Sequence, residues 1–207
     1  MPIELHEPTK TRLPVLRRRI IGEEAVCMLI DVPIQRDILK RDGDGVDRPV
    51  LKSNGKPKQE LVVELLVLPG TTMAAGLGDE IGVPQPGDLV RMILKGGGFG
   101  QWIEAKKAHG GLQVGDVVLS NSTHGQAYDP NTFQPAGPKL LTQAEIDAIP
   151  RGRSVGVYGD LTLRRATPEE APWVAKAEAA YHAKRQADAI EIDPAAEADI
   201  FGGDEPY

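Results

Sequence analysis

The sequence contains few residues that could cross-link the chain or anchor it in a membrane. Cys27 is the one cysteine among 207 residues, so no intrachain disulfide can form and a reducing compartment is the simpler expectation. No apolar run approaches the roughly 20 residues that a membrane-spanning helix needs. Residues 1–14 contain no apolar stretch typical of a secretory signal. We therefore expect no membrane partner and a cytoplasmic location.

Residues typical of catalytic and metal sites are also scarce. The glycine-rich stretch at residues 96–100 is not followed by the Lys-Ser/Thr pair of a phosphate-binding loop. Ser120 and Ser122 lie close to a histidine in sequence, but no Gly-x-Ser-x-Gly motif surrounds them. A lone cysteine supplies no thiolate cluster, and metal-site spacing is lacking among His6, His109, His124 and His182. The sequence predicts no catalytic residue, metal ligand or cofactor.

Basic residues are missing from the end of the chain. From Asp188 onward there are seven acidic residues and no Lys or Arg. The whole chain has 24 Lys+Arg and 30 Asp+Glu, so without those seven acids the balance is 24 against 23. The net charge of −6 therefore comes from this segment. Acidic residues spaced by Pro and Gly-Gly cannot bury enough apolar surface to become ordered. We expect residues 188–207 to form a disordered acidic tail.

What the sequence does contain favours strands. Its 23 Gly and 17 Pro are typical of a turn-rich, mainly β protein. Short apolar runs and alternating patterns of strand length lie between these turn residues. We expect strands at Ala25–Val32, Ile34–Lys40 (continuing the first past a bulge), Glu60–Leu68, Leu89–Leu94, Gln101–Lys107, Val117–Leu119 and Ser154–Arg165.

Two helices have recognisable start signals. Thr142 and Glu145 have the spacing of a capping box, which predicts a short helix that Pro150 would stop. Thr167 and Pro168 are followed by two glutamates, which predicts a second helix running to about Gln186.

The connection at residues 41–58 is rich in turn residues and in charges of both signs. Its aspartates resemble a calcium loop, but the glycine at the sixth position and the glutamate at the twelfth are absent, so we expect a plain turn. Lys52, Lys56 and Lys58 could clamp phosphates or only keep the loop in solvent.

The last residues carry a family resemblance. Asp204, Glu205, Pro206 and Tyr207 are similar to the acidic tip of single-stranded DNA-binding proteins, which closes on Pro-Phe, with Tyr in place of Phe. The body, in length and pattern, resembles the OB-fold members of that family, especially those of bacteriophages. The resemblance implies an OB-fold-like Greek-key barrel with long loops, a C-terminal helix and the tail. It also implies roles in DNA replication, recombination and repair, with partner proteins recruited by the tail and host cytoplasm as the location if the protein is viral.

This interpretation divides the chain into four parts. We expect an N-terminal arm at 1–19, the barrel at 20–166, the C-terminal helix at 167–187 and the flexible tail at 188–207. The helix would pack on the barrel or mediate self-association into a homo-oligomer.

Binding of single-stranded DNA requires cations for phosphates and rings on which bases stack. The chain has nine aromatic residues, and we expect Trp102 to face outward beside Lys106 on a strand whose inner face carries Ile103. Packing of Trp102 in the core is the alternative. The predicted DNA-binding residues are Arg17, Arg18, Arg19, Lys95, Phe99, Trp102, Lys106, Lys107, Tyr128, Phe133, Arg153 and Tyr158.

Two other functions stay open at this point. A non-catalytic structural or assembly β-barrel protein of a virus would use its rings to pack against other subunits. A metal-dependent nuclease would need paired acids, which the scattered Asp31, Asp88 and Asp116 could supply.

Overall fold

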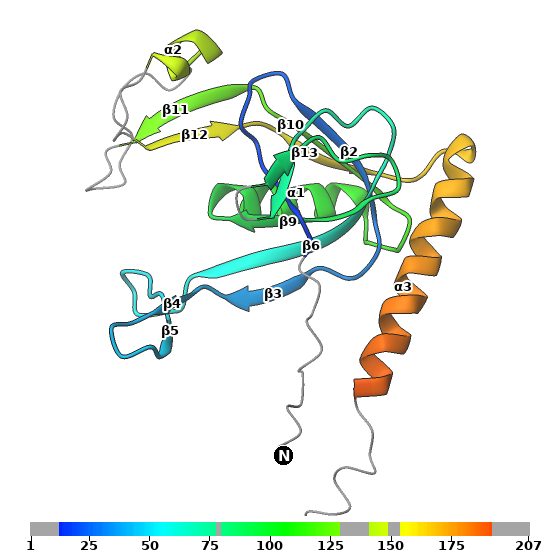
Figure 1. The fold of residues 1–207 in the computed structure, drawn as a ribbon, viewed down its shortest axis with the longest axis horizontal. Helices are drawn as coiled ribbons and strands as arrows, with labels where there is room; N and C mark the ends of the chain where they lie inside the picture. Colours follow the sequence, from blue (N-terminus) through cyan, green and yellow to red (C-terminus); the bar gives the residue numbers. More distant parts are fainter. Residues whose placement is uncertain (1–12, 78–79, 129–140, 149–153, 192–207) are drawn as a thin grey trace, which may run out of the picture.

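The computed structural model describes residues 13–77, 80–128, 141–148 and 154–191. Strands predominate, with three α-helices and one turn of 3₁₀ helix in these ranges (Figure 1). The strands are β1 Val15–Leu16, β2 Glu24–Leu29, β3 Ile34–Asp37, β4 Leu39–Arg41, β5 Asp47–Pro49, β6 Gln59–Val67, β7 Ala75–Leu77, β8 Glu80–Gly82, β9 Leu89–Lys95, β10 Val117–Asn121, β11 His124–Tyr128, β12 Ser154–Tyr158 and β13 Leu161–Arg164. The helices are α1 Gly97–His109, α2 Gln143–Asp147, η1 Pro168–Glu170 and α3 Ala171–Glu191.

The main sheet is built around β6. Its strand order is β13-β10-β2-β6-β9-β1-β7-β8, with β3 also paired to β6. Strands β2, β6 and β9 follow one another as antiparallel neighbours, and β10 returns to lie beside β2. This arrangement of four antiparallel strands is the Greek-key order. The expected mainly β fold is confirmed, and the sheet is mixed because β1 pairs with β9 in parallel.

Two consecutive strands share one edge of β6. Leu29 of β2 lies opposite Leu65, and Ile34 of β3 lies opposite Val62. The chain leaves the ladder between them, at residues 30–33, where Pro33 has no N–H to donate. The prediction of a strand that resumes after an interruption is confirmed for Ile34–Asp37, whereas Leu39 and Lys40 belong to β4 of a separate sheet.

The sheet does not close into a barrel. Among the described residues, no strand pairing joins β9 to β13; β1, β7 and β8 continue the sheet beyond β9 instead. Helix α1 contacts both β9 and β13, and so lies across the gap that a barrel would close. The expected OB-fold-like barrel is therefore not confirmed by the described residues. Val15–Leu16, which we expected in a separate arm, belong to the sheet.

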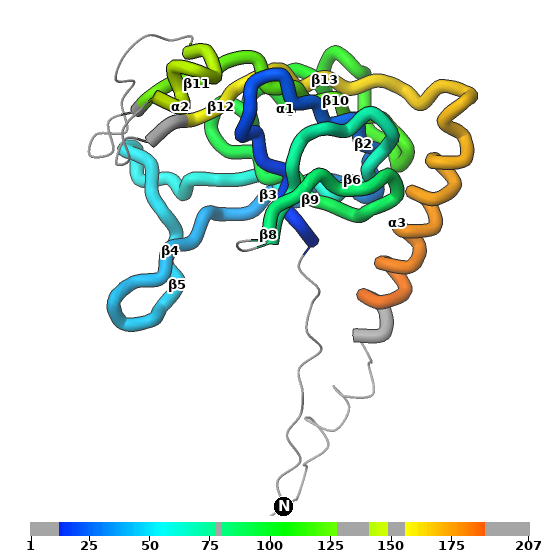
Figure 2. Tube along the Cα trace, turned by 45° about the horizontal axis from the view of Figure 1, so that its top comes forward, coloured from blue at the N-terminus to red at the C-terminus, as the bar shows by residue number. Residues whose placement is uncertain are grey.

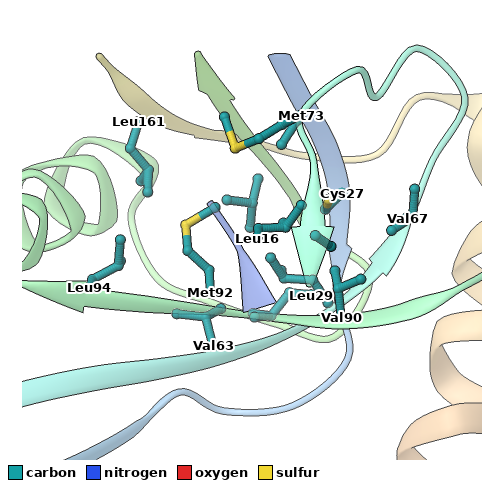
Figure 3. Packing of buried hydrophobic residues seen from close by; sticks show 14 of the residues in the cluster. Leu16, Cys27, Leu29, Val63, Val67, Met73, Val90, Met92, Leu94 and Leu161 are labelled. Carbon is teal, nitrogen blue, oxygen red and sulfur yellow. The ribbon is translucent and has the colours of Figure 1, made fainter. Parts of the chain in front are cut away.

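One face of the sheet encloses the main core. Alternate residues of β6 and β9 point into it, including Val63, Leu65 and Val90, each fully buried (Figure 3). Cys27 from β2 lies in the same cluster, and burial raises the pKa of its thiol to about 12. This thiol is therefore a packing group rather than a nucleophile.

Helix α3 covers part of the opposite face. Met28, Leu66 and Val117 point outward from three neighbouring strands and form a second cluster with Ala177 of the helix. Lys184 extends from α3 to carboxylates on β6 and beside β2, with 2.6 Å contacts to Glu64 and Asp31. Figure 2 shows α3 running along one side of the sheet.

The segment Gln101–Lys107 is a helix, and its prediction as a strand was wrong. It lies within α1, which begins among glycines and ends at Gly110 in the left-handed conformation (φ 81°). Phe99 and Trp102 are three residues apart and point to the same side, into the core. Trp102 is only 3% exposed, so the expected outward orientation was also wrong.

The other two helices follow their start signals. Thr142 and Glu145 form a complete capping box at α2, and Thr167 and Glu170 form one at η1. The last helix continues to Glu191, a few residues beyond the expected end. None of the helices described by the structure combines the length and apolar character needed to cross a membrane.

Candidate nucleic-acid interface

Two arms project from the sheet on the side away from α3. The β4–β5 arm, residues 38–58, leaves between β3 and β6, and the β11–β12 arm, residues 122–159 as far as they are described, leaves between β10 and β13. Figures 1 and 2 both show the two arms on the same side of the molecule, away from α3.

The β4–β5 arm is a pair of short hairpins rich in cations. Turns at residues 42–46 and 52–56 are closed by backbone hydrogen bonds, including Lys52 N to Lys56 O at 2.8 Å. Arg48 pairs with Asp42 at 2.6 Å. Among the residues that the structure describes, no ion pair engages the exposed Lys40, Lys52, Lys56 or Lys58. The arm has six cations against three acids, which makes it a basic projection.

Apolar side chains are exposed on the same arm. Leu39 is 56% exposed and Leu51 is 54% exposed. Exposed aliphatic groups beside unpaired lysines are suited to a partner with both charged and apolar parts. Unstacked nucleotides, with their phosphates and bases, have this character.

A charged triad lies at the root of this arm. Glu60 of β6 is 6% exposed and accepts hydrogen bonds from Arg36 of β3 at 2.7 Å and Lys95 of β9 at 2.9 Å. Burial alone would raise the pKa of Glu60, but the two cations lower it below its ordinary value. Both cations remain about half exposed. The predicted residue Lys95 is therefore held in place by a buried carboxylate.

The β11–β12 arm presents a pair of aromatic rings. His124 and Tyr158 are cross-strand partners, with ring centroids 5.7 Å apart and planes inclined by 24°. The opposite face of the hairpin, at Gly125, is covered by Ile146 of α2 and by Leu141. Figure 1 shows α2 on the side of the hairpin away from β4 and β5. The ring pair therefore lies on the face of the hairpin away from α2.

The five predicted residues around α1 do not form one surface. Phe99 and Trp102 pack in the core, whereas Lys106 and Lys107 are exposed. Lys107 pairs with Glu104 at 2.8 Å. The structure thus separates the rings from the lysines, and Trp102 has no exposed face on which a base could stack.

The predicted arginine cluster follows β1. Arg17 and Arg19 are exposed. Arg18 donates to the buried Ser120 at 2.8 Å and to the carbonyl of Asp160 at 3.2 Å, which links the first segment to β10 and to the turn before β13. Burial lowers the pKa of Arg18, with the nearby Asp160 opposing the shift. Arg18 therefore has a structural contact, and its two neighbours are the available cations.

Other predictions fall outside what the structure describes. Tyr128 ends β11, but its side chain is not described. Phe133 and Arg153 lie in undescribed segments. The same holds for Asp204, Glu205, Pro206 and Tyr207, so the tail remains a prediction.

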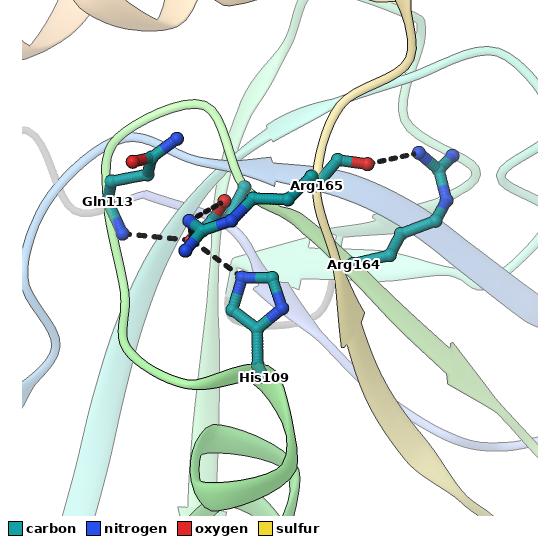
Figure 4. A network of polar contacts seen from close by, with 5 residues as sticks. His109, Gln113, Arg164 and Arg165 are labelled. Carbon is teal, nitrogen blue, oxygen red and sulfur yellow. Dashed lines mark hydrogen bonds and ion pairs between the residues drawn. The ribbon is translucent and has the colours of Figure 1, made fainter.

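The carboxylates considered for a nuclease are engaged elsewhere. Asp116 is fully buried and accepts two hydrogen bonds from Arg165, at 2.7 and 2.9 Å (Figure 4). His109 Nε2 lies 3.0 Å from the same carboxylate but is not aligned for a hydrogen bond. Asp31 binds Lys184, and Asp88 accepts from the N–H of Gln85. Within the described ranges, no three His, Cys, Asp or Glu side chains gather as a metal site would require.

Sequence reasoning missed His124 and Arg36. Both lie in segments whose alternating pattern could have been recognised. In the segment His-Gly-Gln-Ala-Tyr, the small residues Gly125 and Ala127 mark the covered face of β11. His124 therefore lies on the opposite face of the strand. No sequence signal reveals that His124 pairs with Tyr158, because the pairing depends on strand register.

Comparisons with protein-family models, with curated proteins and with solved structures give no match.

Proposed function

We propose that the protein binds single-stranded DNA in replication, recombination or repair, and that the strand lies between the two arms. The observation that carries this proposal is the placement of the arms. Five strands and one helix follow one another along the chain in the order β2, β6, β9, α1, β10 and β13. The β4–β5 arm lies in the connection between the first and second of these strands, and the β11–β12 arm lies in the connection between the fourth and fifth.

This order supports assignment to the OB-fold class. An OB-fold is a five-stranded, partly open Greek-key barrel. It binds oligonucleotides with its second and third strands and with the two connections that bear the arms here. In this chain those strands are β6 and β9, whose outer faces carry Glu60 and Lys95 of the triad. In the described residues α1 lies between β9 and β13, which are not paired, and this departs from a closed barrel.

The side chains of the two arms support the same function. Lysines of the β4–β5 arm supply cations for phosphates, and the rings of the β11–β12 arm supply flat surfaces for bases. Arg36 and Lys95 lie where the first arm joins the sheet. Phosphate contacts and base stacking carry little sequence information, so we expect binding with little sequence preference.

The acidic tail has a role in this proposal. Its end, Pro206 and Tyr207, would bind replication or repair proteins, and its carboxylates would compete with DNA for the basic arm. Such a protein would act in the cytoplasm, that of the host cell if the protein is viral. Self-association into a homo-oligomer would be compatible with the same surface.

The test is fluorescence anisotropy with a labelled oligo-dT strand and a matched duplex at two salt concentrations. We expect tighter binding of the single strand, weakening linearly with the logarithm of salt concentration. Equal affinity for the duplex, or no binding by the full chain and by a chain ending at Glu191, would refute the proposal.

Exposed apolar residues favour one alternative. Leu39, Val46 and Leu51 are each more than half exposed on the β4–β5 arm, and such side chains also pack against other subunits. A structural or assembly protein of a virus would therefore form oligomers through this arm and bind no oligonucleotide. Light scattering of the parent and of a Leu39→Ser, Leu51→Ser variant distinguishes this role.

A further inference from the structure

A groove lies on the face of the sheet that α3 covers only in part. At its centre Leu119 of β10 lies opposite Val26 of β2 on one side and Thr162 of β13 on the other. By strand alternation these residues share a face with Met28 and Val117, which pack against α3. Leu119 and Val26 are only half-buried, so α3 leaves this end of the face open. The groove has a volume of about 390 Å³, and its lining includes Glu24, Val26, Leu119, Asn121, Asp160 and Thr162.

Two exposed carboxylates lie at one end of the groove. Glu24 is the cross-strand partner of Asn121, and the N–H of Asp160 donates to the Asn121 side chain at 2.6 Å. Glu24 uses its backbone N–H and carbonyl for its hydrogen bonds to Thr72. Arg18 donates to the carbonyl of Asp160, at 3.2 Å, rather than to its carboxylate. Both carboxylates are therefore available to the cations of a partner.

The second hairpin of the β4–β5 arm, residues 51–57, has the complementary character. Leu51 and Pro57 form a bridge across it, and the N–H of Lys52 donates to the carbonyl of Lys56 at 2.8 Å. Leu51 is 54% exposed, and both lysines are exposed. One short hairpin thus presents an aliphatic side chain beside two cations, whereas the groove presents an aliphatic floor beside two carboxylates.

We propose that the hairpin at residues 51–57 docks in the groove of a second copy of the chain. Leu51 packs on the aliphatic floor, and the two lysines pair with the two carboxylates. The arm leaves the sheet between β3 and β6, whereas the groove lies over β2, β10 and β13, so the contact joins two different surfaces of the protein. Docking removes from water an exposed leucine and the open end of an apolar face.

This inference goes beyond the proposed function and does not depend on it. Lys52 and Lys56 are among the cations assigned above to phosphates, so a bound strand and a second copy compete for the same hairpin. The test below contains no nucleic acid, and its result is therefore separate from the result of the oligo-dT titration.

The test is sedimentation velocity over a range of protein concentrations at low and high salt. We expect the parent to associate as its concentration rises, and to associate less at high salt, which screens the ion pairs. The groove variant is Glu24→Lys with Asp160→Lys, and the hairpin variant is Lys52→Glu with Lys56→Glu. Each places like charges in contact and should weaken association by at least about tenfold.

A mixture of the two variants tests the contact itself. The groove variant keeps the basic hairpin, and the hairpin variant keeps the acidic groove. An equal mixture should therefore associate again, since each reversed surface then meets one of opposite charge. A variant that had merely lost its fold would not be rescued in this way.

The matched control reverses two exposed carboxylates elsewhere. Glu80→Lys on β8 with Glu178→Lys on α3 changes the net charge by the same amount as the groove variant, and should associate like the parent.

Three results would overturn the docking proposal. The parent could remain monomeric at every concentration at low salt, the groove variant could associate as the parent does, or the mixture could remain as monomeric as its components. Each of these would leave the proposal of strand binding untouched. Conversely, a chain that associates as expected but binds no oligo-dT would keep the docking contact and lose the proposed function.

Discussion

The two sides of the sheet use their charged groups differently. On the α3 side, Lys184 contacts both Asp31 and Glu64, and Arg165 contacts Asp116. On the arm side, lysines stand in solvent and leucines are more than half exposed. Charges that are paired within the fold stabilise it, whereas unpaired ones remain available to a partner. We propose from this difference that α3 contributes to stability and that the arms contribute to binding.

The largest effect should come from the core. Trp102→Ala should lower the free energy of unfolding by about 3–5 kcal/mol, because it removes a buried indole from the cluster under α1. Urea denaturation measures the loss, and Trp173→Ala, which removes a partly buried ring of α3 itself, should cost less. A stable Trp102→Ala protein with lost DNA affinity would instead restore Trp102 as a stacking residue.

Next in size should be the loss of arm cations. Lys52→Gln with Lys56→Gln should reduce the salt slope of oligo-dT binding by about 1.4, which corresponds to about 25-fold in affinity at 0.1 M salt if each lysine contacts one phosphate. The matched control is Lys176→Gln with Arg185→Gln, which removes two cations from α3. Equal losses for both pairs would mean that net charge alone, rather than the arm, determines affinity.

A smaller effect should appear in acid. Hydrogen bonds from Arg164 lower the pKa of Glu170 to about 2 from its ordinary value near 4.5. Because the pKa is lower in the folded state, this pair stabilises the fold above about pH 4.5, and the stabilisation is lost as the pH falls toward 2. Its size is on the order of 1–2 kcal/mol, since Arg164 is partly exposed.

The difference between parent and Glu170→Gln in the free energy of unfolding should therefore shrink between pH 5 and pH 2.5. Glu178→Gln, at an exposed position of α3, is the control. A difference that stays constant over this range would show that the carboxylate charge is not the source of the stability.

The smallest effect should come from the tail. A chain ending at Glu191 loses five acidic residues and no cation. It should bind oligo-dT somewhat more tightly at low salt, and the two chains should converge as salt screens the tail. Unchanged or weaker binding at low salt would remove the tail from the competition for the arm.

The strands were predictable where local signals agreed. Glu60–Leu68 is a continuous apolar run ended by Pro-Gly, and it became β6 almost residue for residue. The capping boxes at Thr142 and Thr167 likewise mark real helix starts. In these segments the pattern and the turn residues point to the same structure.

The sequence pattern gave the wrong secondary structure at α1, and it contained no signal for the pairing of distant strands. Glycines at residues 96–100 are typical of a break, and the apolar side chains of the segment fit a strand as well as a helix. Packing of Phe99 and Trp102 against the open side of the sheet decides between them. The ring pair needs strand register between distant segments, and local pattern does not determine it.

Hydrogen–deuterium exchange with and without oligo-dT tests the division between the two sides most directly. We predict slower exchange in residues 38–58 and in β11 and β12 when the strand is bound, with no change in residues 171–191 of α3. Protection confined to α3, with both arms unaffected, would contradict the account.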